Sequence, residues 1–311
     1  MHHGADHFDY GGKAKRKGNQ IPEGVGFEPT LQLPVNRFSR PTPSTTRPPF
    51  LVGKFLKVSL TGMGRKALQF GFLILGLCVL CLAKPKILSF EILDHFPHTV
   101  TSFTQGLVFY QGKIYESTGL YSQSQIRVLN PKGGQVLDFT VLDPKFFGEG
   151  LTSDGNFLYQ LTWREEIVLV YQINPLRLLK QIQLKGEGWG LAYNFAKREF
   201  YHSDGSATIY IRNSDFKLKS SRTISLNGKP LQKLNELEWD GTSLWSNVWF
   251  CDSLFRLNLQ TGKVTGIVNL TSLRSLQPNP EAVLNGIAHF DTKVFFITGK
   301  LWDRIYKIRI K

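Results

Sequence analysis

A short motif recurs five times in the C-terminal part of this 311-residue chain. It has the form x-Gly/Glu-Leu/Ile, and successive copies begin 44, 40, 46 and 50 residues apart. The five copies are Gln105-Gly106-Leu107, Glu149-Gly150-Leu151, Trp189-Gly190-Leu191, Asn235-Glu236-Leu237 and Asn285-Gly286-Ile287. A repeat of this length indicates one structural unit that is built several times, as in solenoids and propellers.

Between the motif copies the sequence has the character of short strands. Runs rich in Val, Ile, Phe and Tyr alternate with polar residues and end at Gly, Asp or Asn, as hairpin-linked strands do. A second group follows each motif and ends 14 to 16 residues after the motif begins. The second groups are Ser117-Thr118-Gly119, Leu161-Thr162-Trp163, Ser203-Asp204-Gly205, Asn247-Val248-Trp249 and Thr298-Gly299-Lys300. Five units of about four strands each predict an all-β fold, a five-bladed β-propeller.

The fifth unit is one strand short, because the chain stops at Lys311 soon after the strand-like run 304–308. We expect the segment Ile87 to Leu93 to supply the missing strand and close the ring. Closure removes an exposed sheet edge that would otherwise pair with other chains.

The first 62 residues have a composition typical of loops, with Gly-Gly, scattered basic residues and a Pro- and Thr-rich run at 41–49. Neither helical nor strand periodicity is present, so we expect disorder. Residues 26–29 reverse-translate to GGN TTC GAR CCN, which resembles the T-arm of a transfer RNA. Met63 is therefore an alternative start, in which case 1–62 is not natural coding sequence.

Residues 63–83 have the pattern of an export signal. Arg65 and Lys66 form a basic start, Leu68 to Leu82 is almost wholly apolar, and small residues at 81 and 83 suit cleavage after Ala83. The two interpretations are a cleaved signal, which sends the chain to the periplasm or the medium, and an uncleaved membrane tether through 67–83. Residues 84–311 then form the propeller domain.

The net charge of +14 is unevenly divided along the chain. Residues 1–86 hold 13 Lys/Arg and 4 Asp/Glu, which leaves 25 and 20 for residues 87–311, or only +5. A nucleic-acid-binding protein concentrates its positive charge on the binding domain, so the distribution argues against such a partner.

Histidine, cysteine and acidic residues are not spaced as metal ligands. We therefore expect no catalytic metal and no cofactor, and we expect His95 and His98 to cap a strand end. Cys251 is interpreted as a small core residue, because no histidine lies near it in the sequence. Acidic residues of the repeats are expected to bond backbone amides or neighbouring blades, namely Glu116, Asp204, Glu236 and Glu238.

The motif and the second group of each blade should meet at one mouth of the central channel. The first motif positions are Gln105, Glu149, Trp189, Asn235 and Asn285. The second groups contribute Trp163, Asp204 or Gly205, Trp249 and Lys300. Phe103 and Phe147 precede their motifs by two residues and so share a strand face with them. The result is an aromatic box around a glutamate, a lysine and several carboxamides, which suits a small polar substrate.

Glu149 is the acid inside this box. Indole walls remove water from a carboxylate, so we expect a raised pKa that suits proton transfer. In the alternative interpretation the tryptophans are propeller core and Glu149 only pairs with Lys300. Different residues at equivalent positions of the repeat favour a site over simple architecture.

At these residues the sequence resembles the plant and bacterial type of glutamine cyclotransferase. Ten stretches match in order over about 200 residues, among them Phe103-Thr-Gln-Gly-Leu107, Phe147-Gly-Glu-Gly-Leu-Thr152, Glu187-Gly-Trp-Gly-Leu191 and Thr298-Gly-Lys-Leu-Trp302. The resemblance implies a five-bladed propeller without a catalytic metal, an acyltransferase that closes an N-terminal glutamine into pyroglutamate and releases ammonia. The match is looser at 122–125, which should affect a loop more than the chemistry.

The resemblance also implies roles for individual residues. The family's acidic catalyst falls on Glu149, and Lys300 and Asn235 would hold the carboxamide or its oxyanion. The remaining pocket residues fall on Phe103, Gln105, Phe147, Trp163, Trp189 and Trp249. Peptides or proteins with an N-terminal glutamine would be the partners, and we expect a monomer. Two other functions stay open, a non-catalytic binding propeller and a metal-dependent lactonase-like propeller.

Overall fold

The computed structural model describes residues 84–280 and 282–311. The predicted disordered segment 1–62 and the predicted export segment 63–83 lie outside these residues. The described chain is almost entirely strand, and its only helix is α2 (Thr271–Arg274). None of its helices has the length and apolar character needed to cross a membrane.

The strands form five sheets, each containing an antiparallel run of four strands. The first sheet consists of β3 (Thr104–Tyr110), β4 (Lys113–Thr118), β5 (Gln125–Leu129) and β6 (Val136–Val141). The second consists of β7 (Gly148–Ser153), β8 (Phe157–Thr162), β9 (Ile167–Gln172) and β10 (Arg177–Gln183). The third consists of β11 (Leu191–Asn194), β12 (Glu199–Ser203), β13 (Thr208–Arg212) and β14 (Leu218–Thr223).

The last two sheets are the ones that involve the beginning of the described chain. The fourth consists of β17 (Leu234–Trp239), β18 (Leu244–Val248), β19 (Ser253–Asn258) and β20 (Lys263–Asn269), extended by β1 (Lys86–Leu88), β15 (Ser225–Leu226) and β16 (Lys229–Pro230). The fifth consists of β21 (Val283–Asp291), β22 (Val294–Lys300), β23 (Arg304–Ile310) and β2 (Phe90–Pro97).

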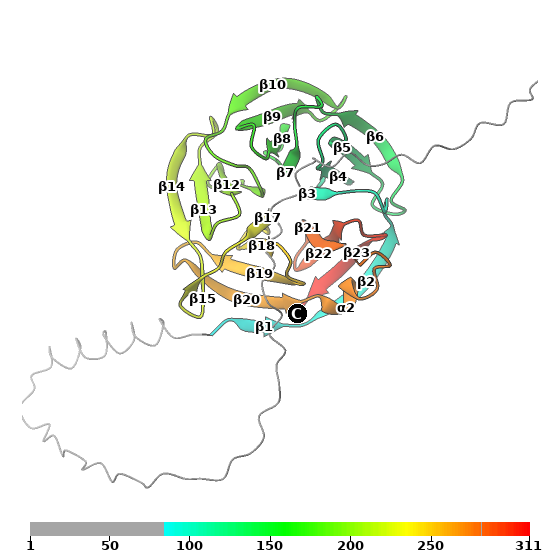
Figure 1. Ribbon diagram of the computed structural model, residues 1–311. Coiled ribbons are helices and arrows are strands. Elements are labelled where there is room, and N and C mark those ends of the chain that lie inside the picture. The colour runs from blue at the N-terminus through cyan, green and yellow to red at the C-terminus, as the bar shows by residue number, and fades with distance from the viewer. Residues whose placement is uncertain (1–83, 281) are drawn as a thin grey trace, which may run out of the picture. The chain divides into compact units, whose positions relative to one another are not determined.

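The sheets surround a common axis (Figure 1). Their first strands contact one another in a closed sequence, β3 to β7, β7 to β11, β11 to β17, β17 to β21 and β21 back to β3. Five hydrophobic clusters fill the five interfaces between neighbouring sheets. The predicted all-β, propeller-like architecture is confirmed, and the apolar core is divided into five wedges that alternate with the sheets.

The motif glycine marks the point of closest approach between first strands. A Cβ at Gly106 would lie 2.4 Å from the backbone nitrogen of Leu151, and one at Gly150 would lie 2.6 Å from that of Leu191. A Cβ at Gly190 would lie 2.0 Å from the carbonyl oxygen of Asn235. Any side chain at these positions would push neighbouring sheets apart. This close approach explains why the repeat is so visible in the sequence.

A strand from before the first repeat completes the fifth sheet, as expected, but its bounds differ from the prediction. β2 (Phe90–Pro97) pairs antiparallel with β23, the last strand of the chain. Residues 86–88 instead form β1, which runs parallel to β20 of the fourth sheet. The two ends of the domain are thereby paired with each other, and the segment predicted as one strand is divided between two sheets.

Candidate active site

The predicted site residues come together at one end of the five sheets. In each antiparallel pair the start of the first strand faces the end of the second, as the pairs Thr104 with Thr118, Gly148 with Thr162 and Val283 with Lys300 show. The motif and the second group therefore meet, as the spacing predicted. Six of the nine named side chains are buried, and three are half-buried. The buried ones are Gln105, Phe147, Glu149, Trp163, Asn235 and Lys300, and the half-buried ones are Phe103, Trp189 and Trp249.

Glu149 is the acidic group of this site and is only 2% exposed. The side-chain amide of Gln105 donates a hydrogen bond of 3.2 Å to its Oε1. Asn285 in turn donates to the Gln105 side-chain oxygen at 3.3 Å and to the Thr104 carbonyl at 2.9 Å. The two carboxamides form a relay that fixes the orientation of Gln105 and so the direction from which Glu149 is hydrogen-bonded.

A second chain of hydrogen bonds fixes the backbone of Glu149. The Tyr171 hydroxyl donates to the Gln160 side-chain oxygen at 2.9 Å, and the Gln160 amide donates to the Ser117 hydroxyl at 2.7 Å. Ser117 then donates to the Glu149 carbonyl at 2.5 Å. Ser203, at the matching place two repeats later, donates to the Asn235 carbonyl at 2.7 Å. A serine in the second group thus anchors the first motif residue of the next sheet.

The aromatic side chains form two groups of touching rings. In the first group, Phe147 lies edge-on to Phe103 at 6.3 Å and contacts Trp163 at 5.4 Å between ring centroids. In the second, Trp189 lies edge-on to Trp249 at 5.7 Å. Edge-to-face packing of this kind is favourable and directional, so the rings hold one another in place.

Two glycines leave the space that these rings occupy. A Cβ at Gly119 would lie 2.4 Å from the Phe147 ring, and one at Gly205 would lie 2.6 Å from the Trp189 ring. Asp204, the alternative to Gly205 in the sequence prediction, instead accepts hydrogen bonds from the Tyr210 hydroxyl and the Ser206 amide. Gly205 is therefore the residue of that second group which meets the aromatic side chains.

Glu187 joins the two aromatic groups, and the sequence analysis gave it no role. Its Oε2 accepts the indole N–H of Trp163 at 3.0 Å and that of Trp189 at 3.1 Å. Its Oε1 accepts from Arg164 at 3.2 Å, and the Arg164 guanidinium lies 3.9 Å above the Trp163 ring. Its position two residues before Trp189 was the available signal, because alternate residues of an extended segment share a face.

Lys300 and Asn235 border the same site. The Lys300 ammonium is buried, and its Nζ lies 4.6 Å from the centroid of the Phe103 ring, a cation–π distance. The side-chain oxygen of Asn235 is buried and accepts no hydrogen bond from the residues that the structure describes. A buried acceptor without a partner costs free energy, which a ligand N–H would recover.

Tyr121 is a further aromatic residue at this end that the sequence analysis did not single out. Its ring lies 5.4 Å from Phe147, and its hydroxyl donates to Glu165 at 2.8 Å. Burial is the main cause, and this hydrogen bond to a carboxylate the second, that raises the pKa of Tyr121 to about 12. The phenol is therefore neutral at physiological pH.

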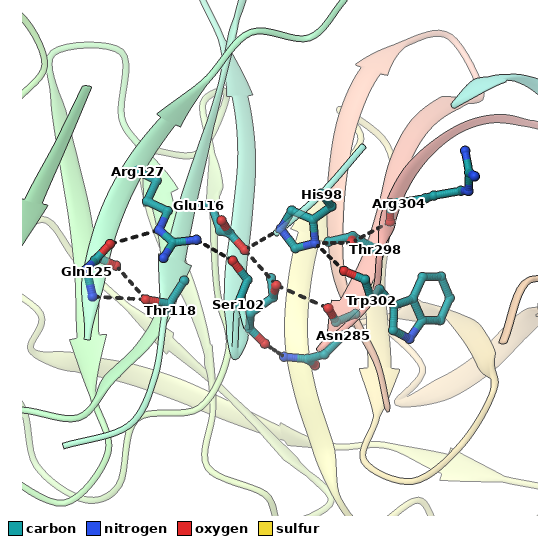
Figure 2. A network of polar contacts seen from close by, with 12 residues as sticks. His98, Ser102, Glu116, Thr118, Gln125, Arg127, Asn285, Thr298, Trp302 and Arg304 are labelled. Atoms are coloured by element: carbon teal, nitrogen blue, oxygen red, sulfur yellow. Dashed lines mark hydrogen bonds and ion pairs between the residues drawn. The ribbon is translucent and has the colours of Figure 1, made fainter. Parts of the chain in front are cut away.

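His98 and Glu116 form a buried link beside the site (Figure 2). His98 directly follows β2, so it lies at a strand end as predicted; its Nε2 lies 2.9 Å from Glu116 Oε1 and its Nδ1 lies 3.0 Å from the Trp302 carbonyl. Burial pushes the pKa of Glu116 upward, but His98 and the Thr104 hydroxyl outweigh it and hold that pKa below its ordinary value. The link ties the first sheet to the end of β22, where Lys300 lies.

The acids of the fourth repeat bond backbone amides, as predicted. Glu236 accepts from the amides of Leu107 at 3.2 Å and Ile287 at 3.0 Å, which belong to the first and fifth sheets. Glu238 accepts from the His289 amide at 2.7 Å. Burial raises the pKa of Glu236 well above its ordinary value and that of Glu238 to about 8. These two carboxyl groups connect sheets and lie outside the aromatic site.

Within the described residues, no group of three or more His, Cys, Asp or Glu side chains has the arrangement of a metal site. The absence of a catalytic metal stays a prediction.

Comparison with known proteins adds the remaining evidence. Residues 74–310 match the sequence profile of the glutamine cyclotransferase family. A glutaminyl-peptide cyclotransferase of Arabidopsis thaliana is 35% identical over 236 residues, which cover 73% of this chain and 72% of that protein. The crystal structure of Myxococcus xanthus glutaminyl cyclase is similar at a TM-score of 0.68, with 35% identity over 73% of this chain and 99% of that one. With the profile spanning nearly the whole described ring, this chain belongs to the glutamine cyclotransferase family.

Proposed function

We propose that the chain is a glutaminyl-peptide cyclotransferase, an enzyme that acts on the N-terminal glutamine of peptides. The α-amine attacks the carbon of the glutamine's own side-chain carboxamide, so a carbon–nitrogen bond forms and closes a five-membered lactam. The bond to the carboxamide nitrogen breaks and ammonia leaves. One proton must move from the attacking amine to the departing nitrogen, and no other atom is exchanged.

Glu149 carries this proton in the proposed mechanism. It accepts the proton from the amine and returns it to the leaving nitrogen, which is general base and general acid catalysis by one group. The observation that carries the proposal is the position of this carboxylate. It is 2% exposed, it is oriented by Gln105, and it lies at the end of the sheets where the aromatic residues gather. Both reacting groups belong to one substrate, so restricting their conformation supplies much of the rate.

Lys300 and Asn235 would hold the reacting carboxamide. An ammonium at this position stabilises negative charge that develops on the carboxamide oxygen. The buried side-chain oxygen of Asn235 suits an N–H of the same carboxamide. Trp163, Trp189 and Trp249, with Phe103 and Phe147, would enclose the aliphatic part of the glutamine and exclude water.

Four further proposals concern the protein as a whole. Each sheet would serve as one blade of a five-bladed propeller, since five first strands close the ring. The reaction would proceed without a metal, because proton transfer and charge stabilisation are both assigned to side chains. The chain would be exported by the signal or anchor predicted at 63–83, to the periplasm or the medium. It would act as a monomer.

The test is ammonia release from a peptide with an N-terminal glutamine, followed with and without EDTA. We expect turnover at the same rate with and without the chelator, and a product lighter than the substrate by one molecule of ammonia. A chain that binds the peptide without forming this product would support the binding-module alternative. Turnover that EDTA abolishes would contradict the metal-free mechanism.

A further inference from the structure

A cavity of about 240 Å³ lies beside the proposed active site, at the same end of the first sheet. Its walls come from the segment before β3, the end of β4, the loop that follows and β5. Thr101, Ser122 and Gln123 of its lining are exposed, so the cavity is reached from solvent. The proposed reaction gives no role to this space.

Phe103 is the wall that the cavity shares with the active site. The Lys300 ammonium lies over its ring at 4.6 Å, and the Phe147 ring lies edge-on to it. Gly119 also lines the cavity, and a Cβ on it would lie 3.0 Å from Gln105 Cγ. An extended peptide advances roughly 3.3–3.6 Å per residue. If the glutamine is enclosed by Phe103 as proposed, the next residue of the peptide would come within reach of the cavity on the other side of that ring.

Arg127 is the only charged residue in the cavity lining. Its Nε donates to the Gln125 side-chain oxygen at 2.9 Å, and its Nη1 donates to the Ser102 hydroxyl at 2.5 Å (Figure 2). Two of the five N–H groups of the guanidinium are used in this way, and they fix its plane. The other polar side chains of the lining carry hydroxyls and carboxamides, which are uncharged and can donate hydrogen bonds to an anion.

Arg127 attracts the Glu116 carboxylate of the same sheet electrostatically, but the guanidinium hydrogen bonds described above go to other groups. Glu116 lies opposite Arg127 in the strand pairing, but its hydrogen bonds go to His98 and Thr104. A rigid guanidinium that keeps free N–H groups is suited to a carboxylate, which it binds in a bidentate, charge-assisted manner.

We propose that this cavity binds a carboxylate in the part of the peptide that follows the N-terminal glutamine. The carboxylate would be either an acidic side chain at the second position or the free C-terminus of a dipeptide. The inference rests on the proposed function and deepens it, because it assigns a substrate preference to a residue outside the reacting centre.

The experiment compares kcat/KM for pairs of short substrates. The first pair is Gln-Glu-amide and Gln-Gln-amide, which differ only in the charge of the side chain. The second pair is Gln-Ala with a free C-terminus and Gln-Ala-amide. We expect the acidic member of at least one pair to be preferred by roughly tenfold, as for one charged hydrogen bond in partly solvated surroundings. The pair that shows the preference identifies the source of the carboxylate, and equal values within both pairs would overturn the proposal.

The variant Arg127→Gln should bring the preferred ratio close to one. The ratio is taken within one protein, so a general loss of activity does not affect it. Arg309→Gln is the matched control, because Arg309 is paired with Val294 at the opposite end of β22 from Lys300. This control should keep the wild-type ratio. A ratio that survives in Arg127→Gln, or is lost equally in Arg309→Gln, would contradict the assignment.

A binding measurement separates this proposal from the proposed function. Calorimetric titration of Glu149→Gln and of Glu149→Gln/Arg127→Gln, each with Gln-Glu-amide and with Gln-Ala that has a free C-terminus, needs no turnover. We expect roughly tenfold weaker binding when Arg127 is replaced. If binding is weakened in this way but the wild type forms no pyroglutamate, the carboxylate-binding cavity would be supported and the proposed reaction rejected. Equal binding of both peptides by the two proteins would reject the cavity.

Discussion

Glu149 and Glu236 are both buried glutamates at the starts of first strands, but their surroundings differ. Glu236 is hydrogen-bonded by backbone amides of two other sheets, which hold both of its oxygens. Glu149 is approached by the side-chain amide of Gln105 and lies at the end of the sheets where the aromatic rings gather. A carboxyl group fixed by backbone connects the fold, whereas one oriented by side chains is placed to meet a substrate. The following predictions test this division.

The largest effect is expected from Glu149→Gln. The substitution keeps the size of the side chain but removes the group that carries the proton, so kcat should fall by about 10²–10⁴-fold. Ammonia release from a Gln-peptide measures the loss. The thermal unfolding midpoint should stay close to that of the wild type, because the Gln105 relay and the Ser117 bond to the backbone do not need the charge.

Glu236→Gln should show the opposite behaviour. One of the two oxygens that accept backbone N–H groups becomes an amide donor, so a buried bond is lost at a cost of about 1–3 kcal/mol. Thermal unfolding should begin several degrees lower, while kcat per folded molecule stays near the wild-type value. A variant as stable as the wild type but catalytically dead would reverse the division between the two glutamates.

Glu187→Ala tests how the aromatic groups are held. Loss of the oxygen shared by Trp163 and Trp189 frees both indoles, so KM should rise by roughly tenfold, about 1.4 kcal/mol, with a smaller change in kcat. The control is Glu199→Ala, because Glu199 begins β12 at the end opposite Ser203 and its carboxylate forms an ion pair with the exposed Lys219. Steady-state kinetics that show a fall in kcat at constant KM would argue against a positioning role.

The last prediction concerns the pH dependence of stability. Burial raises the pKa of Glu238 to about 8, so the folded chain retains a proton that the unfolded chain releases above its ordinary pKa. This stabilising contribution is complete at pH values below the unfolded pKa and is lost as pH rises toward 8, at roughly 1 kcal/mol per pH unit. Unfolding midpoints of Glu238→Gln between pH 5 and 8 should therefore fall less steeply than those of the wild type. Parallel curves would show that Glu238 is ionised in the folded state.

Much of the fold was predictable because close approach of strands leaves a mark in the sequence. The motif glycines are required where neighbouring first strands touch, and this requirement produces a visible repeat. The meeting of motif and second group followed from hairpin geometry alone, so the residues of the site were predicted to share one end. The division of 86–97 between two sheets was not predictable, because a strand-like sequence does not specify which sheet edge it will join.

The long-range side-chain bonds were also not predictable from the sequence. His98 binds Glu116, Glu187 binds two tryptophans, and Arg127 is fixed by Ser102, and in each case at least one partner lies in a segment outside the strands. Such pairs depend on rotamers and on the rotation of one sheet against the next. The spacing of residues along the chain contains no information on rotamers or on the rotation of the sheets. The two-residue distance from Glu187 to Trp189 was nevertheless a usable signal.

The most direct test of the central claim is the leaving-group dependence of cyclisation in Glu149→Gln. The wild type and the variant would be compared on a peptide with N-terminal glutamine and on one with N-terminal glutamate γ-methyl ester, whose alkoxide leaves with less need of a proton. If Glu149 delivers the proton to the departing nitrogen, the variant's deficit should be at least about tenfold smaller for the ester. An equal deficit for both substrates would show that Glu149 does not protonate the leaving group.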